Sequence, residues 1–377
     1  MLTDIMAGRL HIGISGCGIG GMATALMMSR AGHNVQIFDR FTTPEPLGSG
    51  LVIQPVGLNV LKFLGLSDVI LARGHKIFKM FGTECDSKRA VLNVDYGPPG
   101  GATFGIGIHR ASLFDALYQA LMKSSVTIIG GTSITSTQHA SNKRTLTSED
   151  GRVHGPFDLV IDASGAHSPL SPIKSRPLGY GALWGAVAWP DRTNLPTGRL
   201  SQSYQKAHHM LGVLPIGTMP GSNKQCAAIF WSEPRERLSD WYQSDLDAWK
   251  AKTIALWSEF APFVAQIKSH SDMTAARYSH GTLMRPFGNH IAYIGDSAHQ
   301  ASPQLGQGAN MALLDAKALA DSLDEYDDIG MALGQYAAAR RYHVGLYQLF
   351  SAVFTPFYQS NSRVLPKLRD NVMNPMS

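Results

Sequence analysis

Two glycine-rich clusters lie near opposite ends of this 377-residue chain and carry the residues best suited to chemistry. They read Gly16-Cys17-Gly18-Ile19-Gly20-Gly21 and, much later, Gly295-Asp296-Ser297-Ala298-His299, Pro303 and Gly306-Gln307-Gly308-Ala309-Asn310. Glycines at a helix start leave backbone N–H groups unhindered at the positive end of the helix dipole, which suits a phosphate or an anionic ring. Either cluster alone predicts a nucleotide site. Together they predict one long cofactor held at both ends, as FAD is.

The first cluster joins a predicted strand over residues 10–14 to a predicted helix that extends to residue 31. Gly16 permits a tight turn, Gly18 lets the backbone approach a pyrophosphate, and Gly21 lets the helix pack closely on the strand. A second predicted strand, over residues 35–38, ends at Asp39, close to the spacing expected for an acid on a ribose 2′-OH. The next residue, Arg40, is a further candidate cofactor contact.

The second cluster has the same order of strand, turn and helix. A short apolar run over residues 291–294 ends at Gly295, and a helix is predicted over residues 309–323. Asp296, at the strand end, is predicted to accept hydrogen bonds from ribityl or ribose hydroxyls.

The composition narrows the class of protein. The net charge of +5 comes from 33 basic and 28 acidic residues without a dense run, so no nucleic-acid partner is predicted. Three distant cysteines fit neither a disulfide framework nor a zinc site, and no metal is predicted. Because there is no signal-like segment and no run of about 18 apolar residues, we expect no stable membrane insertion and a cytoplasmic location.

The elements between the two clusters change in character. From about residue 181 to 278 the chain has strand-like segments with aromatic side chains, interrupted by one predicted helix over about 246–267. We predict an α/β fold, with a Rossmann-like FAD-binding domain, a mixed β-sheet substrate domain and C-terminal helices. The predicted boundaries are 9–75, 100–178 and 280–330 for the discontinuous FAD-binding domain, 76–99 and 179–279 for the substrate domain, and 331–377 for the C-terminal helical region.

These motifs resemble those of the FAD-dependent aromatic hydroxylases, the para-hydroxybenzoate hydroxylase-like (group A) flavoprotein monooxygenases. The dinucleotide fingerprint of the family matches Gly16, Gly18 and Gly21 with Asp39. Its late Gly-Asp-Ala-Ala-His motif is present with one change, Ser297 for alanine. The resemblance covers nearly the whole chain and implies a GR2-type Rossmann-like fold.

The resemblance also implies roles for individual residues. Arg110, at a helix start after His109, matches the family arginine that lies along the FAD phosphates. Pro303 is implied to lie beside the flavin as part of the catalytic site. The N–H groups of Gly306, Gly308 and Ala309 are implied to face the N1–C2=O region of the flavin, with Asn310 continuing that contact.

The middle family motif departs from the pattern. The family has Ala-Asp-Gly, then Ser and Val-Arg, whereas this chain reads Asp162-Ala163-Ser164-Gly165-Ala166-His167-Ser168-Pro169-Leu170. Ser164 stands where the family has aspartate, and no arginine follows at the usual place. We still expect Ser164 to contact the cofactor, but we expect NADPH or NADH to reduce this protein poorly or in an unusual way.

The resemblance implies a monooxygenase that hydroxylates a small aromatic or heteroaromatic substrate with O₂, through a flavin C4a-hydroperoxide. The flavin carries this chemistry, so no protein acid or base is obligatory. Tyr204, His209 and Tyr278 are candidate catalytic residues because a phenol or imidazole beside the ring could assist deprotonation.

Two alternative functions remain open from the sequence. Ser164 motivates an FAD-dependent reductase or dehydrogenase that inserts no oxygen, and a non-catalytic, redox-responsive flavin-binding regulator is a third class. A separate flavin reductase is a candidate partner. The chain is expected to be a monomer or a homodimer.

Overall fold

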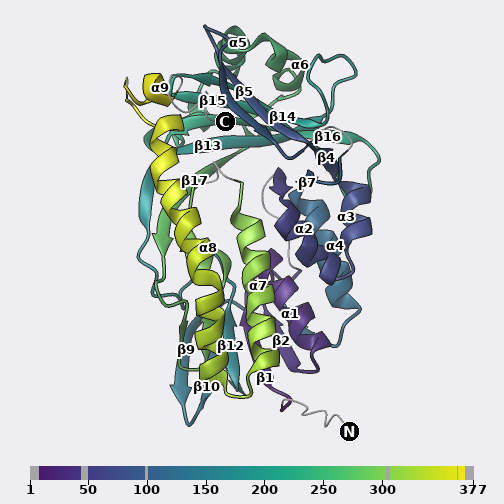
Figure 1. Ribbon diagram of the computed structural model, residues 1–377, viewed down its shortest axis with the longest axis vertical. Helices are drawn as coiled ribbons and strands as arrows, with labels where there is room; N and C mark the ends of the chain where they lie inside the picture. Colours follow the sequence, from purple (N-terminus) through teal and green to yellow (C-terminus); the bar gives the residue numbers. More distant parts are fainter. Residues whose placement is uncertain (1–7, 44–49, 98–100, 303–305, 363, 370–377) are drawn as a thin grey trace.

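The computed structural model describes residues 8–43, 50–97, 101–302, 306–362 and 364–369. Pro303, which the resemblance places beside the flavin, lies outside these described residues. Two large sheets dominate the molecule, one of six strands and one of eight, and a long helix lies alongside both (Figure 1). The combination of sheets and C-terminal helices agrees with the predicted fold class.

The six-stranded sheet is assembled from segments far apart in the sequence. Its order is β18-β19-β12-β1-β2-β8, with β1 parallel to both β2 and β12. Its strands are β1 (His11–Ser15), β2 (Asn34–Phe38), β8 (Thr127–Ile129), β12 (Leu159–Asp162), β18 (Phe287–Gly288) and β19 (Ile291–Tyr293). Ile12, Ile14 and Ile161 are fully buried, as expected for parallel strands covered on both faces.

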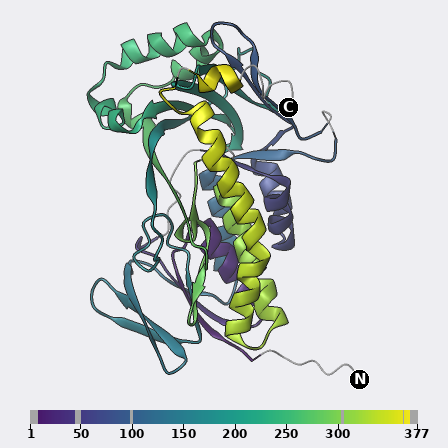
Figure 2. The same cartoon turned by 60° about the vertical axis from the view of Figure 1, so that its left-hand side comes forward.

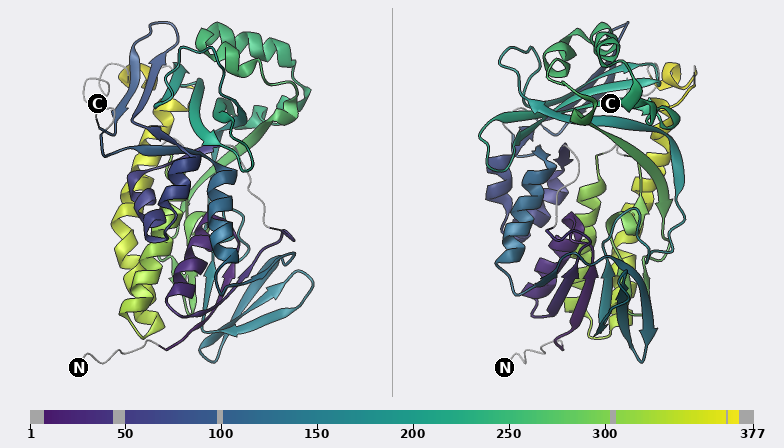
Figure 3. Two further views of the ribbon diagram at one scale, coloured as in Figure 1. Left: turned by 90° about the vertical axis from the view of Figure 1, so that its right-hand side faces the viewer. Right: turned by 180° about the vertical axis from the view of Figure 1, so that it is seen from behind.

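Helices from both ends of the chain cover this sheet. The helix α1 (Ile19–Arg30) contacts both α4 (Arg110–Met122) and α7 (Gly308–Glu325) (Figure 3). A Cβ atom at Gly20 would lie 3.2 Å from the Cβ of Ala312, so a glycine lets α1 and α7 approach closely. The predicted helix over 309–323 is confirmed as α7.

An antiparallel three-stranded sheet extends from the lower part of the molecule (Figure 2). It contains β9 (Ile134–Ala140), β10 (Lys143–Ser148) and β11 (Val153–Phe157). The next strand, β12, does not continue this sheet but joins the parallel sheet between β1 and β19. All four residues of β12 are buried there.

The eight-stranded sheet has the order β20-β17-β13-β16-β15-β14-β5-β6. Its strands are β5 (Lys79–Glu84), β6 (Ala90–Asp95), β13 (Arg176–Ala188), β14 (Arg199–Gln205), β15 (His209–Thr218), β16 (Gln225–Pro234), β17 (Met273–Thr282) and β20 (His299–Gln300). All of its pairings are antiparallel except that between β14 and β5. It is therefore mixed, as predicted for the substrate domain.

One helix was predicted over about 246–267, and this prediction is wrong in extent. The segment forms α5 (Leu246–Leu256) and the short α6 (Ala261–Val264), both lying over the outer face of the eight-stranded sheet (Figure 1). Pro262 explains the break, because proline has no N–H for an interior helix bond and is tolerated in a first turn.

Smaller elements fill the space between the two large sheets. They are a sheet of β3 (Gly50–Ile53), β7 (Gly105–His109) and β4 (His75–Ile77), and the helices α2 (Pro55–Phe63) and α3 (Ser67–Arg73). The short helix α9 (Leu365–Leu368) lies instead beside the eight-stranded sheet (Figure 1). The domain boundaries given above stay a prediction.

The helix α8 (Ile329–Tyr358) runs from beside the parallel sheet to the eight-stranded sheet (Figures 1 and 2). The side chain of Asp328 caps its start by accepting from the N–H of Met331 at 2.8 Å. Its buried face includes Tyr336, Arg340 and Tyr347. Among the described residues, no helix combines the length and the apolar character needed to cross a membrane.

Candidate functional site

A single cavity of about 860 Å³ is lined by residues from both large sheets. Gly16, Gly18 and Asp39 line it near the parallel sheet, whereas Trp184 and Tyr278 line it on the eight-stranded sheet. The two glycine clusters, 280 residues apart in the chain, therefore border the same space. We call the part lined by Gly16, Gly18 and Asp39 the cofactor end, and the part lined by Trp184 and Tyr278 the ring end.

Three glycines of the first cluster, Gly16, Gly18 and Gly21, are favoured at their positions for different structural reasons. Gly16 has a φ of +102°, and a Cβ there would lie 2.6 Å from the carbonyl oxygen of Ala163. A Cβ at Gly21 would lie 1.9 Å from the carbonyl oxygen of Gly16, so the helix can pack only with glycine there, as predicted. Gly18 differs, because a Cβ there would meet no atom within 4 Å. Its space belongs to the cavity.

Asp39 fixes the shape of the glycine loop from the end of β2. One carboxylate oxygen accepts from the N–H of Cys17 at 2.8 Å, and the other accepts from the N–H of Phe41 at 3.0 Å. The carboxylate thus holds the loop while it lines the cavity. The adjacent Arg40 also lines the cavity and lies over the ring of Phe41.

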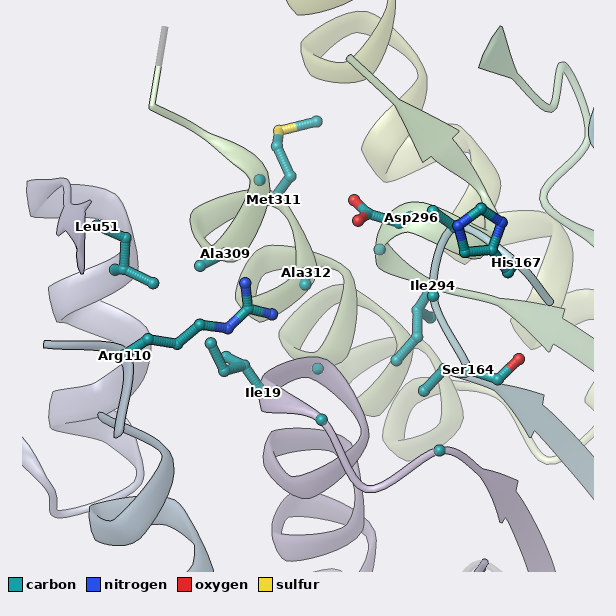
Figure 4. Close-up of a pocket in the computed structure, with 18 of the residues that line it drawn as sticks. Ile19, Leu51, Arg110, Ser164, His167, Ile294, Asp296, Ala309, Met311 and Ala312 are labelled. Atoms are coloured by element: carbon teal, nitrogen blue, oxygen red, sulfur yellow. The ribbon is translucent and has the colours of Figure 1, made fainter. Parts of the chain in front are cut away.

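The turn after β19 presents a carboxylate to the cavity. Gly295 has a φ of +59°, which favours glycine, and Asp296 follows with its side chain directed into the open space (Figure 4). The Asp296 carboxylate faces the open cavity, and the cavity at this point lies deep in the protein. Burial raises the pKa of Asp296, and the nearby charges of His299 and Arg110 oppose that rise.

Ser297, the one change in the late family motif, gains a hydrogen bond that alanine could not make. Its hydroxyl oxygen lies 2.7 Å from the carbonyl oxygen of Asp162 and 2.8 Å from that of Ile294. The hydroxyl therefore joins the turn to the end of β12 in the middle of the parallel sheet.

The start of α7 brings further backbone N–H groups to the cavity. Gly306, Gly308 and Ala309 line it, and the first N–H groups of a helix have no acceptor within the helix. The side chain of Asn310 instead makes hydrogen bonds within the protein. It accepts from the N–H of Gln54 at 2.8 Å and donates to the carbonyl oxygen of Val52 at 3.0 Å, so it joins α7 to β3 and to the residue that follows β3. The Asn310 side chain does not line the cavity.

Arg110 is the first residue of α4 and points into the cavity from the side opposite Asp296 (Figure 4). A cation at a helix N-terminus is unfavourable by about 0.3–1 kcal/mol, because it meets the positive end of the dipole. Burial lowers the pKa of Arg110, and Asp296 opposes that shift. A phosphate group in the cavity would offset both the unfavourable interaction of Arg110 with the helix dipole and the cost of burying its guanidinium.

The middle motif supplies its carboxylate from a different position than expected. Asp162, at the end of β12, accepts from the hydroxyl of Ser164 at 2.6 Å and from that of Ser168 at 2.5 Å. Burial raises the pKa of Asp162, and these hydroxyl hydrogen bonds oppose the rise. Ser164 itself lines the cavity. The family carboxylate that is absent at residue 164 is therefore present at Asp162, two residues earlier. There it stabilises the turn by accepting hydrogen bonds from Ser164 and Ser168.

A buried ion network lies behind Asp296. The carboxylate of Asp315, fully buried, lies 2.6 Å from Nε2 of His299 and 2.7 Å from Nε of Arg340, and it accepts from the N–H of Gly295 at 2.8 Å. Burial alone would raise the pKa of Asp315, but His299 and Arg340 outweigh it and lower the pKa to about 2. Burial would lower the pKa of His299, but Asp315 reverses the shift and raises it.

The ring end of the cavity is largely apolar and aromatic. Trp184 packs on Phe230 with ring centroids 4.6 Å apart, and its indole N–H donates to the hydroxyl of Tyr278 at 2.6 Å. Burial raises the pKa of Tyr278, so its phenol stays protonated at neutral pH. The other described residues that line this end include Met80, Leu200, Gln202, Met210 and Leu214.

Two of the three predicted catalytic candidates on this sheet lie outside the cavity lining, and only Tyr278 lines it. His209 is on β15 next to Met210, which lines the cavity, so the alternation of a strand turns His209 to the other face. There it stacks on Trp231 with centroids 4.5 Å apart, and burial and then Lys252 lower its pKa to about 4.

Tyr204 lies beyond the ring end of the cavity and does not line it. It is 2 % exposed, its hydroxyl donates to Oε1 of Gln202 at 2.7 Å, and its ring packs against Tyr358. The cavity residues that the sequence did not single out include Gln54, Gln202, Met210 and Phe230. Only the alternation along β14, β15 and β16 could have indicated the last three.

Comparisons with known proteins agree with this geometry. The sequence profile described as FAD binding domain matches residues 9–328 of this chain. The chain is 24% identical over 340 residues to the FAD-dependent urate hydroxylase of Klebsiella oxytoca, covering 87% of this chain and 85% of that protein. It is 25% identical over 321 residues to the 2-heptyl-3-hydroxy-4(1H)-quinolone synthase of Pseudomonas aeruginosa, covering 81% and 79%. The structure of Klebsiella pneumoniae HpxO complexed with FAD and uric acid is similar with a TM-score of 0.82, at 19% identity, covering 98% of this chain and 94% of that chain.

Proposed function

Because this chain belongs to the FAD binding domain family, we propose that it is an FAD-dependent monooxygenase that hydroxylates a small aromatic or heteroaromatic compound. One observation carries the proposal: the cavity that begins at the dinucleotide loop continues without a break to the aromatic ring end. A flavin-binding protein without turnover would need only the first part of this cavity.

The described residues fit FAD. The open space in front of Gly18 leaves room for a pyrophosphate at the start of α1, and Arg110 supplies a cation to the same cavity. Asp39 and Asp296 present carboxylates that accept hydrogen bonds from hydroxyl groups. The N–H groups of Gly308 and Ala309 suit the oxygen and nitrogen edge of a flavin ring.

When bound, FAD would supply the redox chemistry that hydroxylation of an aromatic substrate by O₂ requires, with electrons from a nicotinamide donor or a separate reductase. The protein positions the substrate and excludes water. Trp184 and Phe230 offer flat apolar faces on which an aromatic ring stacks. Tyr278, held by Trp184, offers a fixed hydroxyl beside that ring.

We expect the purified protein to be yellow, with about one non-covalent FAD per chain, and to transfer one atom of O₂ to its substrate. The test is a screen of aromatic compounds for stimulated NADPH or NADH oxidation, in which the products are analysed by mass after reaction under ¹⁸O₂. A reductase or dehydrogenase would consume reductant and give products without ¹⁸O. Protein that cannot be loaded with FAD would refute the proposal.

We further propose that this protein takes electrons from NADPH or NADH slowly, or receives them from a separate reductase. The hydroxyl of Ser164 is bonded to Asp162, and the place of the family arginine holds Ser171, whose hydroxyl donates to the carbonyl oxygen of Ser297 at 2.5 Å. Neither side chain offers a cation to a nicotinamide phosphate, for which a bidentate arginine is the strong partner.

Stopped-flow reduction of the bound FAD by NADPH and NADH, with substrate present, measures this directly. We expect rates well below about 10 s⁻¹, the general scale of enzyme turnover. Dithionite serves as the control, because it should reduce the same FAD completely. Fast and saturable reduction by either nicotinamide would contradict the prediction and show that other residues bind the donor.

A further inference from the structure

Three polar side chains of the ring end, Gln54, Gln202 and Tyr278, each accept one hydrogen bond from a neighbouring side chain of the protein. Oε1 of Gln54 accepts from the hydroxyl of Tyr96, and Oε1 of Gln202 accepts from the hydroxyl of Tyr204. The oxygen of Tyr278 accepts from the indole N–H of Trp184 at 2.6 Å. Each of the three keeps a donor for a ligand, namely an amide N–H or the phenolic O–H, although one N–H of Gln202 also points to Sδ of Met210 at 3.7 Å.

The ring end also has no charged side chain among its described lining residues. The ionised or basic side chains that line the cavity belong to the cofactor end: Asp39, Arg40, Arg110, Glu149, His167, Asp296 and His299. The other side chains named at the ring end, among them Met80, Leu200, Leu214 and Phe230, are apolar. A ligand there thus meets neutral donors on an apolar wall.

From these two observations we propose that the ring end selects an uncharged aromatic or heteroaromatic compound that carries carbonyl or hydroxyl oxygens, and that it excludes carboxylates. This inference rests on the proposed function, and it narrows the substrate class of that same site. It also assigns Tyr278 as a specificity-determining residue that donates to a substrate oxygen.

The separation of the donors explains why they do not form a carboxylate site. Gln202 is on β14 and Tyr278 is on β17, and three strands lie between β14 and β17 in the sheet. Four strand spacings place the two strands about 19 Å apart. The two donors are therefore too far apart to bind both oxygens of one carboxylate, and a buried carboxylate would lack a compensating cation, which is strongly unfavourable.

The experiment compares three probes on the oxidised, FAD-loaded protein by equilibrium dialysis, without reductant. They are 4-quinolone, 4-quinolone-2-carboxylate and naphthalene, which share a bicyclic ring but differ in charge and in acceptor oxygens. We expect the carboxylate to bind roughly 100-fold or more weakly than 4-quinolone, from the cost of an unpaired buried charge. Naphthalene should bind more weakly than 4-quinolone because it leaves the donors unpaired.

Tyr278→Phe should weaken 4-quinolone binding about 3- to 10-fold, the worth of one neutral hydrogen bond, and change naphthalene binding less than about twofold. Tyr242→Phe is the matched control, because Tyr242 is 59% exposed and lies outside the cavity lining. Binding of the carboxylate as tight as that of 4-quinolone, or unchanged 4-quinolone affinity in Tyr278→Phe, overturns the inference.

The outcomes separate this inference from the proposed function. Binding in the expected order without any ¹⁸O-labelled product would refute the monooxygenase and leave the ligand class standing. Tight binding and hydroxylation of an aromatic carboxylate would refute the ligand class and leave the monooxygenase standing.

Discussion

A Gly18→Val variant should fold normally and bind FAD at least about 100-fold more weakly than the unchanged protein, a loss of about 2.7 kcal/mol or more. Gly18 has φ −81° and ψ −173°, which any residue adopts, and a Cβ there meets no atom within 4 Å. The valine therefore costs the apoprotein little beyond a poorer helix cap, about 1 kcal/mol. Its side chain occupies the space that the pyrophosphate needs.

Titration of the apoprotein with FAD, followed by flavin fluorescence, gives the affinity, and thermal unfolding without FAD gives the stability. Gly345→Val, at an exposed position of α8 with nothing within 4 Å, is the matched control and should change neither quantity much. Gly21→Ala provides the contrast. Its Cβ would lie 1.9 Å from the carbonyl oxygen of Gly16, so it should unfold the loop with or without FAD. Unchanged FAD affinity in Gly18→Val would place the pyrophosphate elsewhere.

Asp315→Asn should lower the free energy of unfolding by about 3–5 kcal/mol, the usual cost of removing one partner from a buried ion pair. The carboxylate is fully buried between His299 and Arg340, and asparagine removes the counter-charge that the two side chains share. Chemical denaturation at pH 5.5 measures the loss. Asp321→Asn is the control, since Asp321 pairs with Lys317 on the surface and should contribute less than about 1 kcal/mol.

The pH dependence gives this prediction a signature. The pKa of Asp315 is lowered from 3.8 to about 2 in the folded protein, so its stabilisation is present above about pH 4 and is lost as the pH falls toward 2. The pKa of His299 is raised above 6.5, so its contribution is present below that pH and is lost as the pH rises through the folded value. The difference between the two proteins should shrink on both sides of this window. A difference independent of pH would refute the ionic account.

The two glycine clusters made the cofactor half of the fold predictable from the sequence. Backbone requirements are local, so a positive φ at Gly16 and the contact between Gly21 and the preceding turn can be inferred from residue type and spacing. The helix over 309–323 was predictable for the same reason. The role of Asn310 was not, because its partners, Gln54 and Val52, lie more than 250 residues away in the chain.

The ring end was harder to predict, because a strand places neighbouring residues on opposite faces. His209 and Met210 differ by one position, yet only Met210 lines the cavity. No local signal decides which of two adjacent residues faces inward when both faces of the sheet are covered. Asp162 shows a second limit, since a family motif locates a charge by its position, whereas folding can supply it from a neighbouring residue.

The split origin of the parallel sheet has a consequence for biosynthesis. Because β12 ends at Asp162 and its neighbour β19 begins at Ile291, the ribosome must add about 130 residues before the sheet can close. At about 5–20 residues per second this takes on the order of 10 s. During that interval an apolar strand edge is unpaired, and half of the FAD site has not yet been made. We expect FAD to be captured only near the end of translation and the nascent chain to depend on chaperones until then.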